Sequence, residues 1–209
     1  MNVVEKTNKS DWERFIAAHS PQSYFQAWEW GEIEKEGGRK VWRIGVVNPK
    51  SETMHGLSQI VKVEAKRGTF LHVRHGPVLR KWDEESFTMW LDWIVDLGKR
   101  EHAWFIRISP MIGSDKQELV SQFGFRPAPI HSMDAEVVSI VDLSQSEELL
   151  LKNMKKNTRN LIRRGMREEV VVNHCPIDDF AKLYAETASR HGFVPHQKVK
   201  EEFAAFSKD

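Results

Sequence analysis

The sequence predicts a mixed α/β domain, and three observations support this fold class. Some segments alternate apolar and polar residues as strands do, whereas others repeat apolar residues every three or four positions as helices do. The two kinds of segment interleave along the chain instead of forming separate blocks. The 209 residues are 40% apolar, which is enough for a core that needs no covalent staples.

The first elements are one strand and two helices. Residues 2–7 form a short apolar strand pattern, and Ser10 with Glu13 makes a capping box that predicts a helix start. The segment SYFQAWEWGEIEKEGG, residues 23–38, places aromatic and aliphatic residues at helical spacing before two glycines.

A meander of three strands follows, over residues 40–48, 57–65 and 69–78. The last of these ends at Gly76-Pro77, a pair that predicts a turn because glycine permits close backbone approach and proline fixes φ. A structural turn and a substrate contact both remain open interpretations of this pair.

The next elements alternate helix and strand. Asp83 caps a helix whose apolar stripe runs to Gly98, and residues 103–112, AWFIRISPMI, form an apolar run typical of a central strand. Residues 115–124 predict a helix, and 135–143 a last extended stretch. The resulting order is that of the acyltransferase fold called GNAT, so we predict an α/β (α+β), GNAT-like domain.

The beginning of this pattern recurs near the end of the chain. VVEKTNKSDWERFIAAH starts at Val3, and VVVNHCPIDDFAKLYAE starts at Val170 with its aspartate at the same spacing. We therefore predict one complete domain, residues 1–143, followed by a basic linking helix and the start of a truncated second GNAT-like domain, residues 144–209. Coincidence is the alternative, because strand-turn-helix units are common.

A basic stretch links the two parts. LLLKNMKKNTRNLIRRGMREEV, residues 149–170, predicts one amphipathic helix opened by a capping box at Ser144 and Glu147. A solvated face is one interpretation, but no acidic residue interleaves with the basic ones, which favours an anionic partner: RNA, a diphosphate-linked substrate or a membrane surface. The basic residues opposite the apolar stripe are Lys152, Lys155, Lys156, Arg159, Arg163 and Arg167.

Bulk properties exclude several classes of protein. The formal net charge of +1 points to no partner by itself, and Cys175, the only cysteine, excludes an intramolecular disulfide and a cysteine-based zinc cluster. The sequence contains no apolar run long enough to span a membrane, and we expect that its first residues are not a signal peptide. The histidines lack metal-ligand spacing. We expect a cytoplasmic, monomeric protein without a metal.

Three stretches in a consistent order resemble a known family: SYFQAWEWGEIEKEGGRKVWRIGV, FLHVRHGPV, and the basic stretch with YAETASRHGFVPH. They are similar to the Fem-type aminoacyltransferases (FemX, FemA, FemB and MurM-like proteins), which build peptidoglycan interpeptide bridges. The resemblance implies two tandem GNAT-like domains and transfer of an amino acid from aminoacyl-tRNA, a co-substrate, with no other cofactor. The acceptor would be the side-chain amine of a muramyl pentapeptide, on lipid II or its UDP-linked precursor, with peripheral contact at the inner face of the membrane.

The resemblance also implies site residues. Trp30 and Lys35 lie where the family contacts the muramyl precursor, although the family's lysine can instead align with Glu34. Trp28 is interpreted as core, because large aromatic residues are mostly buried. Ser109 stands where FemX-like members have an aspartate, and a serine is not a general base by itself.

Two further positions come from RHGFVPH. His196 falls where a phosphate-contacting arginine occurs, and a histidine there can still donate to phosphate. Arg190 and His191 are either structural or part of the substrate site.

Two other functions compete with this one. The first is a GNAT N-acyltransferase that uses acetyl-CoA, whose phosphates would need a glycine-rich loop at a helix start; no loop of the form Q/R-x-x-G-x-G/A occurs in residues 1–209. The second is a non-enzymatic RNA-binding or inhibitory module. We expect these 209 residues alone to be inactive, because the family's cleft also draws on the second domain.

Overall fold

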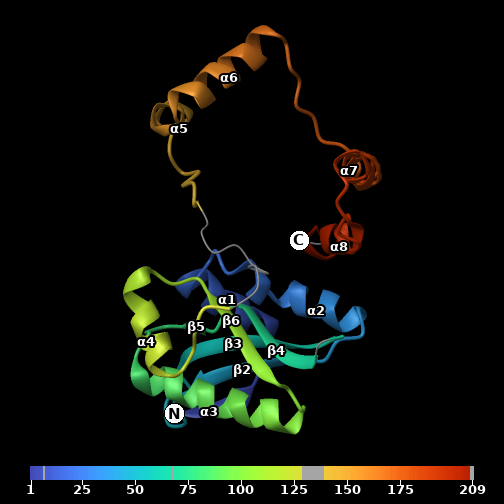
Figure 1. Ribbon diagram of the computed structural model, residues 1–209. Coiled ribbons are helices and arrows are strands. Elements are labelled where there is room, and N and C mark those ends of the chain that lie inside the picture. Colours follow the sequence, from blue (N-terminus) through green and yellow to red (C-terminus); the bar gives the residue numbers. More distant parts are fainter. Residues whose placement is uncertain (7, 67, 129–138, 208–209) are drawn as a thin grey trace. The chain divides into compact units, whose positions relative to one another are not determined.

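The computed structural model describes residues 1–6, 8–66, 68–128 and 139–207 (Figure 1). Contacts divide the chain into two compact units, Met1–Glu136 with Glu201–Asp209, and Val137–Lys200. The predicted boundary at residue 143 stays a prediction. The elements up to residue 128 are β1 (Asn2–Glu5), α1 (Lys9–His19), the 3-10 helix η1 (Tyr24–Gln26), α2 (Trp28–Glu36), β2 (Val41–Val47), β3 (Met54–Ala65), β4 (Gly68–His75), β5 (Val78–Leu79), α3 (Glu84–Arg100), β6 (Phe105–Pro110), the 3-10 helix η2 (Ser114–Lys116) and α4 (Gln117–Gln122). The later elements are α5 (Glu147–Asn153), α6 (Lys156–Arg167), α7 (Ile177–His191) and α8 (Val199–Phe206).

The described strands form a single sheet in the order β1-β2-β3-β4-β6, with β5 paired to β3. Neighbours are antiparallel as far as β4, which confirms the predicted meander, whereas β4 and β6 are parallel. Parallel neighbours need a crossover connection, and α3 provides it. The predicted order of elements is thus confirmed from β1 to α4.

Helix α3 covers one face of the sheet (Figure 1). Its stripe of Phe87, Trp90, Ile94 and Leu97 is buried against aliphatic residues of β2, β3 and β4, and Asp83 accepts a hydrogen bond from the backbone N–H of Ser86 at 2.9 Å. The predicted cap and core face are confirmed. This apolar layer fixes the sheet from below the site, because each large buried side chain contributes about 1.5 to 3 kcal/mol.

Helices α1 and α2 cover the opposite face, where the core is half apolar and half polar. Trp12, Phe15 and Ile16 of α1 form the apolar half with Leu57 and Val78. The polar half lies under α2 and builds the site described next.

One prediction in this unit is wrong and another stays a prediction. The N-cap of α1 is Asn8, whose side chain accepts from the Asp11 backbone N–H at 3.1 Å, and not Ser10; asparagine is as strong a cap as serine, and it lies two residues earlier. Among the described residues β6 pairs with β4 alone, and Phe105 is 49% exposed, so the predicted central position of this strand stays a prediction. A run of apolar residues indicates that a strand is buried, but it does not determine how many strands pair with it.

The described part of the second unit is helical, and the single predicted basic helix is two. Met154 and Lys155 have extended backbone between α5 and α6, and Ser146 rather than Ser144 caps α5, accepting from the Leu149 N–H at 3.3 Å. Arg159 closes the break, donating to the carbonyls of Lys152 and Met154. Such a break leaves the apolar periodicity nearly unchanged, so the sequence pattern did not reveal it.

Two predicted extended segments form no strand where they are described. Residues 135–138 lie outside the described residues, and 139–143 have no strand structure. Residues 170–176 are also irregular, and the helix that the strand-turn-helix repeat predicts after them is α7, which begins at Ile177. Strands need hydrogen-bonded neighbours, and apolar sequence alone does not supply them.

Candidate functional site

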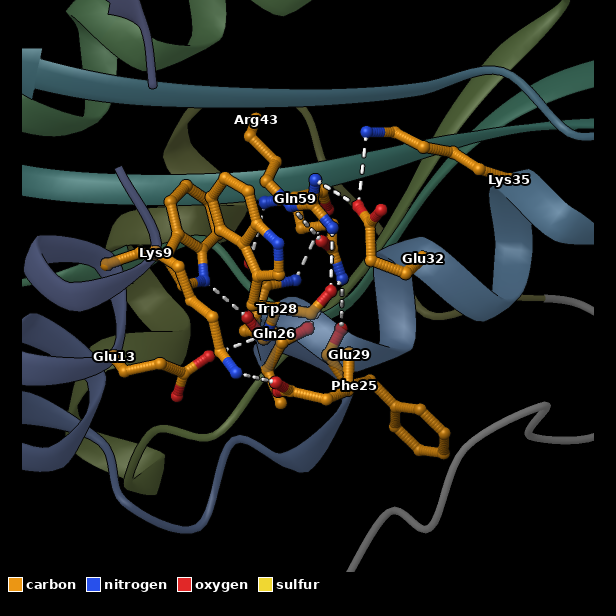
Figure 2. Close-up of polar contacts among 12 residues, drawn as sticks. Lys9, Glu13, Phe25, Gln26, Trp28, Glu29, Glu32, Lys35, Arg43 and Gln59 are labelled. Carbon is orange, nitrogen blue, oxygen red and sulfur yellow. Dashed lines mark hydrogen bonds and ion pairs between the residues drawn. The ribbon is translucent and has the colours of Figure 1, made fainter. Parts of the chain in front are cut away.

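A buried glutamine holds the entry to α2 against the sheet (Figure 2). The Gln26 side chain is fully buried, and its Nε2 donates to the carbonyl oxygens of Arg74 at 2.6 Å and Gln59 at 3.3 Å. Its Oε1 accepts from the Gln59 backbone N–H at 2.7 Å, and its own carbonyl accepts from Trp12 Nε1 at 2.7 Å. Gln26 therefore bonds to β3, β4 and α1 together.

A cross-strand pair completes this network. Arg43 of β2 lies opposite Gln59 of β3, and Arg43 Nε donates to Gln59 Oε1 at 2.8 Å. Gln59 Nε2 donates to the carbonyls of residues 25 and 27 at 3.2 and 3.1 Å. Arg43 Nη2 donates to the carbonyl of Trp28 at 2.6 Å, and the guanidinium lies 3.8 Å from the centre of the Trp28 ring. Arg43 is only 4% exposed, and these partners accept the hydrogen bonds from its Nε and Nη2.

The WEWG glycine is explained by this network. A Cβ on Gly31 would lie 2.1 Å from Gln59 Oε1 and 2.3 Å from Arg43 Nη2. Only glycine lets α2 come this close to the polar pair.

The ends of β4 and β6 bring the motifs together. The backbone N–H of His75 donates to Ser109 Oγ at 3.1 Å, in register with the parallel pairing of Arg74 and Ser109. His75 has a φ of 52°, and a Cβ on the following Gly76 would lie 2.7 Å from the amide nitrogen of Gln26. The turn after β4 is therefore packed directly on the segment that enters α2.

Aromatic rings cover this strand end. The ring centre of Phe25 lies 4.6 Å from that of Trp30 and 4.6 Å from that of His75. The guanidinium of Arg74 lies 3.2 Å from the Phe25 centre and 5.2 Å from that of Trp30. Trp30 is 6% exposed, and its buried Nε1 has no hydrogen-bond partner in the described structure.

A cavity of about 270 Å³ adjoins the same strand ends. Residues 77–80 and Trp82 line it on the β4 side, and residues 111–113 on the β6 side. His19 also lines it; burial and the charge of Arg80 lower the pKa of this imidazole below its ordinary value. The strand ends thus have room beside them for part of a substrate.

The predicted residues of the first unit differ in exposure. Trp30 is buried among aromatic rings, whereas Lys35 is exposed and pairs with Glu32 at 3.2 Å. Glu34, the alternative alignment for the family's lysine, is 5% exposed and pairs with Arg39 at 2.7 Å. Ser109, His75, Phe25 and Trp30 form one chain of contacts, and Lys35 lies further along the helix that carries Trp30.

The other predicted residues belong to the second unit. Arg190 is exposed in the last turn of α7, and the backbone N–H of His196 donates to the hydroxyl of Tyr184 at 3.2 Å. Arg159 is engaged with helix-end carbonyls, and the remaining basic residues of the stretch are exposed. Their role in binding stays a prediction.

Sequence reasoning missed the residues that build the site, Gln26, Arg43, Gln59, Arg74 and His75. A signal for two of them was present. Arg43 and Gln59 are polar residues inside otherwise apolar strands, and a polar residue at a core position needs a partner.

We compared the chain with known protein families, curated proteins and solved structures. The model of the FemAB family matches residues 7–123, more than half of the chain and all of the strand-end site. The chain belongs to the FemAB family. Lipid II:glycine glycyltransferase of Staphylococcus aureus is 22% identical over 209 residues, covering 93% of this chain and 49% of that protein. The crystal structure of FemX aligns with a TM-score of 0.78 at 19% identity, covering 98% of this chain and 55% of that one.

Two consequences follow from these comparisons. The predicted resemblance to Fem-type proteins and the predicted α/β fold are confirmed. The chain spans about half the length of the curated relatives it matches.

Within the described ranges, no helix is long and apolar enough to cross a membrane, and no group of three or more His, Cys, Asp or Glu side chains is placed to hold a metal ion.

Proposed function

We propose that the protein containing this chain transfers an amino acid from aminoacyl-tRNA to the side-chain amine of a muramyl stem peptide, carried on lipid II or a UDP-linked precursor. One observation carries the proposal: within the FemAB-matched region, Trp30, Phe25, His75 and Ser109 meet at the ends of the parallel strands β4 and β6, next to a cavity. The similarity to a lipid II:glycine glycyltransferase supports a peptidoglycan precursor as acceptor.

The proposed reaction needs no covalent intermediate on the enzyme. An aminoacyl ester is already activated, so the attacking amine forms the amide bond and the ester oxygen leaves with the 3′-terminal ribose of the tRNA. The protein must bring the two substrates together, take a proton from the ammonium and stabilise the tetrahedral oxyanion. No nucleophilic residue is needed, and Cys175 has no proposed role.

The site residues fit separate tasks in this scheme. The Trp30 indole supports an apolar wall for the acceptor, and Lys35 offers a positive charge to an anionic group of the same substrate. The Ser109 hydroxyl accepts a hydrogen bond from the His75 backbone N–H and is not a base by itself, so a general base must be another group or water. The basic residues of α5 and α6 provide a charged surface for the tRNA acceptor end or the diphosphate.

A transfer assay tests the donor. The protein containing this chain is mixed with tRNA carrying a labelled amino acid and with lipid II or UDP-muramyl pentapeptide. Label should move to the muramyl acceptor, and ribonuclease added beforehand should abolish the transfer.

Two results would overturn the proposal. Transfer that survives prior ribonuclease would remove tRNA as donor, and transfer of labelled acetyl from acetyl-CoA in its place would favour the acetyltransferase interpretation. Retention of RNA in filter binding across a salt series, without transfer to any muramyl acceptor, would favour an RNA-binding module.

A further inference from the structure

A chain of ion pairs runs from the buried interior of the first unit to the exposed end of α2 (Figure 2). Oε1 of Glu32 accepts from Arg43 Nη1 at 2.7 Å and from Lys35 Nζ at 3.2 Å. A single carboxylate oxygen therefore joins a buried guanidinium to an exposed ammonium.

The outer pair alone would not hold Lys35 in place. Glu32 and Lys35 side chains are each 46% exposed, and exposed pairs one helical turn apart contribute little because water and rotamer freedom compete. The pair Asp96 and Lys99 of α3 shows the ordinary case, with the same sequence spacing, a distance of 3.3 Å and, among the described residues, no buried partner for either side chain.

Glu32 differs because its second partner, Arg43, is buried and held by other hydrogen bonds. The Arg43 side chain is 4% exposed, its Nε donates to Gln59 and its Nη2 donates to the Trp28 carbonyl. These two bonds fix the orientation of the guanidinium and therefore the position of Nη1 beside Glu32. Partial burial acts to raise the pKa of Glu32, but hydrogen bonds from Arg43 and Lys35 outweigh it and lower this pKa below its ordinary value. The carboxylate is thus ionised and fixed at neutral pH.

We propose that Glu32, anchored by Arg43, is a positioning residue that aims the ammonium of Lys35 at an anionic oxygen of the muramyl acceptor. The inference rests on the proposed function, in which Lys35 contacts that substrate. A lysine is a flexible point charge, and restraining it before binding reduces the entropy lost when the anion binds. Glu32 itself need not touch the substrate.

Binding measurements on four variants test the inference. Glu32→Gln keeps the shape and the hydrogen bond to Arg43 but removes the charge that restrains Lys35; it should raise the Kd for UDP-muramyl pentapeptide about three- to tenfold, while kcat changes less than about twofold. In a Lys35→Gln background, Glu32→Gln should have no further effect, because it acts through Lys35. Asp96→Asn, the matched control, should leave Kd unchanged.

Two probes identify the anion. Uridine diphosphate and the free stem pentapeptide, each measured alone, show whether Lys35 contacts a phosphate or a carboxylate. The probe whose Kd rises in the Glu32→Gln variant carries the oxygen that Lys35 contacts. If Kd for UDP-muramyl pentapeptide is unchanged in Glu32→Gln, or rises equally with Lys35 already replaced, the inference is wrong while the proposed function stands.

Carboxyl titration by nuclear magnetic resonance separates the two failures. In the unmodified protein Glu32 should titrate below its ordinary pKa, and Lys35→Gln should raise that pKa. If the titration behaves so but the protein binds none of the three ligands, the proposed function is overturned together with the role of Glu32. A Glu32 pKa that does not respond to Lys35→Gln overturns the positioning contact itself.

Discussion

Replacement of Gly31 by alanine should destabilise the first unit, although alanine is the better helix former. Gly31 lies within α2, where alanine would ordinarily add about 1 kcal/mol of stability. The new Cβ would instead lie 2.1 Å from Gln59 Oε1 and 2.3 Å from Arg43 Nη2, closer than real Cβ atoms approach such neighbours. The network under α2 must therefore move.

The expected magnitude follows from what the movement breaks. The hydrogen bonds from Arg43 to Gln59 and to the Trp28 carbonyl, 2.8 and 2.6 Å long, lie in that network, and a buried polar group left unpaired costs about 1 to 3 kcal/mol. Overpacking costs about the same. After the gain in helix propensity, we expect a net loss of about 2 to 4 kcal/mol.

Urea unfolding followed by tryptophan fluorescence measures this loss. The eight tryptophans all lie between residues 12 and 104, so the signal reports the first unit. The midpoint should fall by about 1 to 2 M, given a slope of about 2 kcal/mol per M. Gly98→Ala in α3 is the control: its Cβ would meet its nearest neighbour at 3.8 Å, an ordinary contact, and stability should hold or rise by up to about 1 kcal/mol. A midpoint for Gly31→Ala equal to or above that of the unmodified protein would refute the reasoning.

Three other perturbations test separate parts of the account. Ile94→Ala, at a side chain with no exposed surface, should lower the free energy of unfolding by about 2 to 5 kcal/mol in the same assay; a loss below about 1 kcal/mol would contradict the core assignment. Asp83→Ala should cost about 1 kcal/mol at pH 7. The backbone hydrogen bond that Asp83 accepts lowers the pKa of its carboxyl below the ordinary value. The stability that the cap contributes is therefore full above the ordinary pKa and is lost as pH falls through the folded-state pKa. A stability difference between the two proteins that does not change with pH would contradict this role of the cap. Replacing Lys155, Arg159 and Arg163 with glutamine should raise the KM for one anionic substrate several-fold without changing the circular dichroism spectrum. Because Arg159 also bonds to carbonyls at the end of α5, a double variant at Lys155 and Arg163 separates the loss of charge from an effect on folding. An unchanged KM for both substrates would show that the basic stretch is an ordinary solvated surface.

Local patterns predicted the parts of the fold that depend on local physics. The α3 stripe and its Asp83 cap could be predicted because helix periodicity and capping act within a few residues. The meander followed from alternation and turn residues in the same way. These elements place the strand ends, so the general position of the site was within reach of the sequence.

The chemistry of the site depends on pairs that are distant in sequence. Arg43 and Gln59 are 16 residues apart and meet only because β2 and β3 pair in one particular register. Gln26 reaches the Arg74 carbonyl across 48 residues. Each of these polar residues had no visible partner in the sequence, so it could be recognised as unusual but not assigned.

Backbone breaks and edges were also beyond the sequence patterns. The extended residues Met154 and Lys155 interrupt the basic helix without disturbing its apolar spacing, and the stabilising contacts come from Arg159. The outer position of β6 among the described strands reflects which segments find hydrogen-bonding partners, a property of the whole sheet.

Mass spectrometry of the acceptor tests the central claim most directly. UDP-muramyl pentapeptide is incubated with the protein containing this chain and a pool of charged tRNAs, and the acceptor is then weighed and fragmented. We predict a mass gain of one aminoacyl residue, located on a side-chain amine of the stem peptide and reduced by Trp30→Ala more strongly than by the exposed-surface variant Asp96→Asn. An unmodified acceptor, or one that gains only an acetyl group when acetyl-CoA is supplied, would contradict the account.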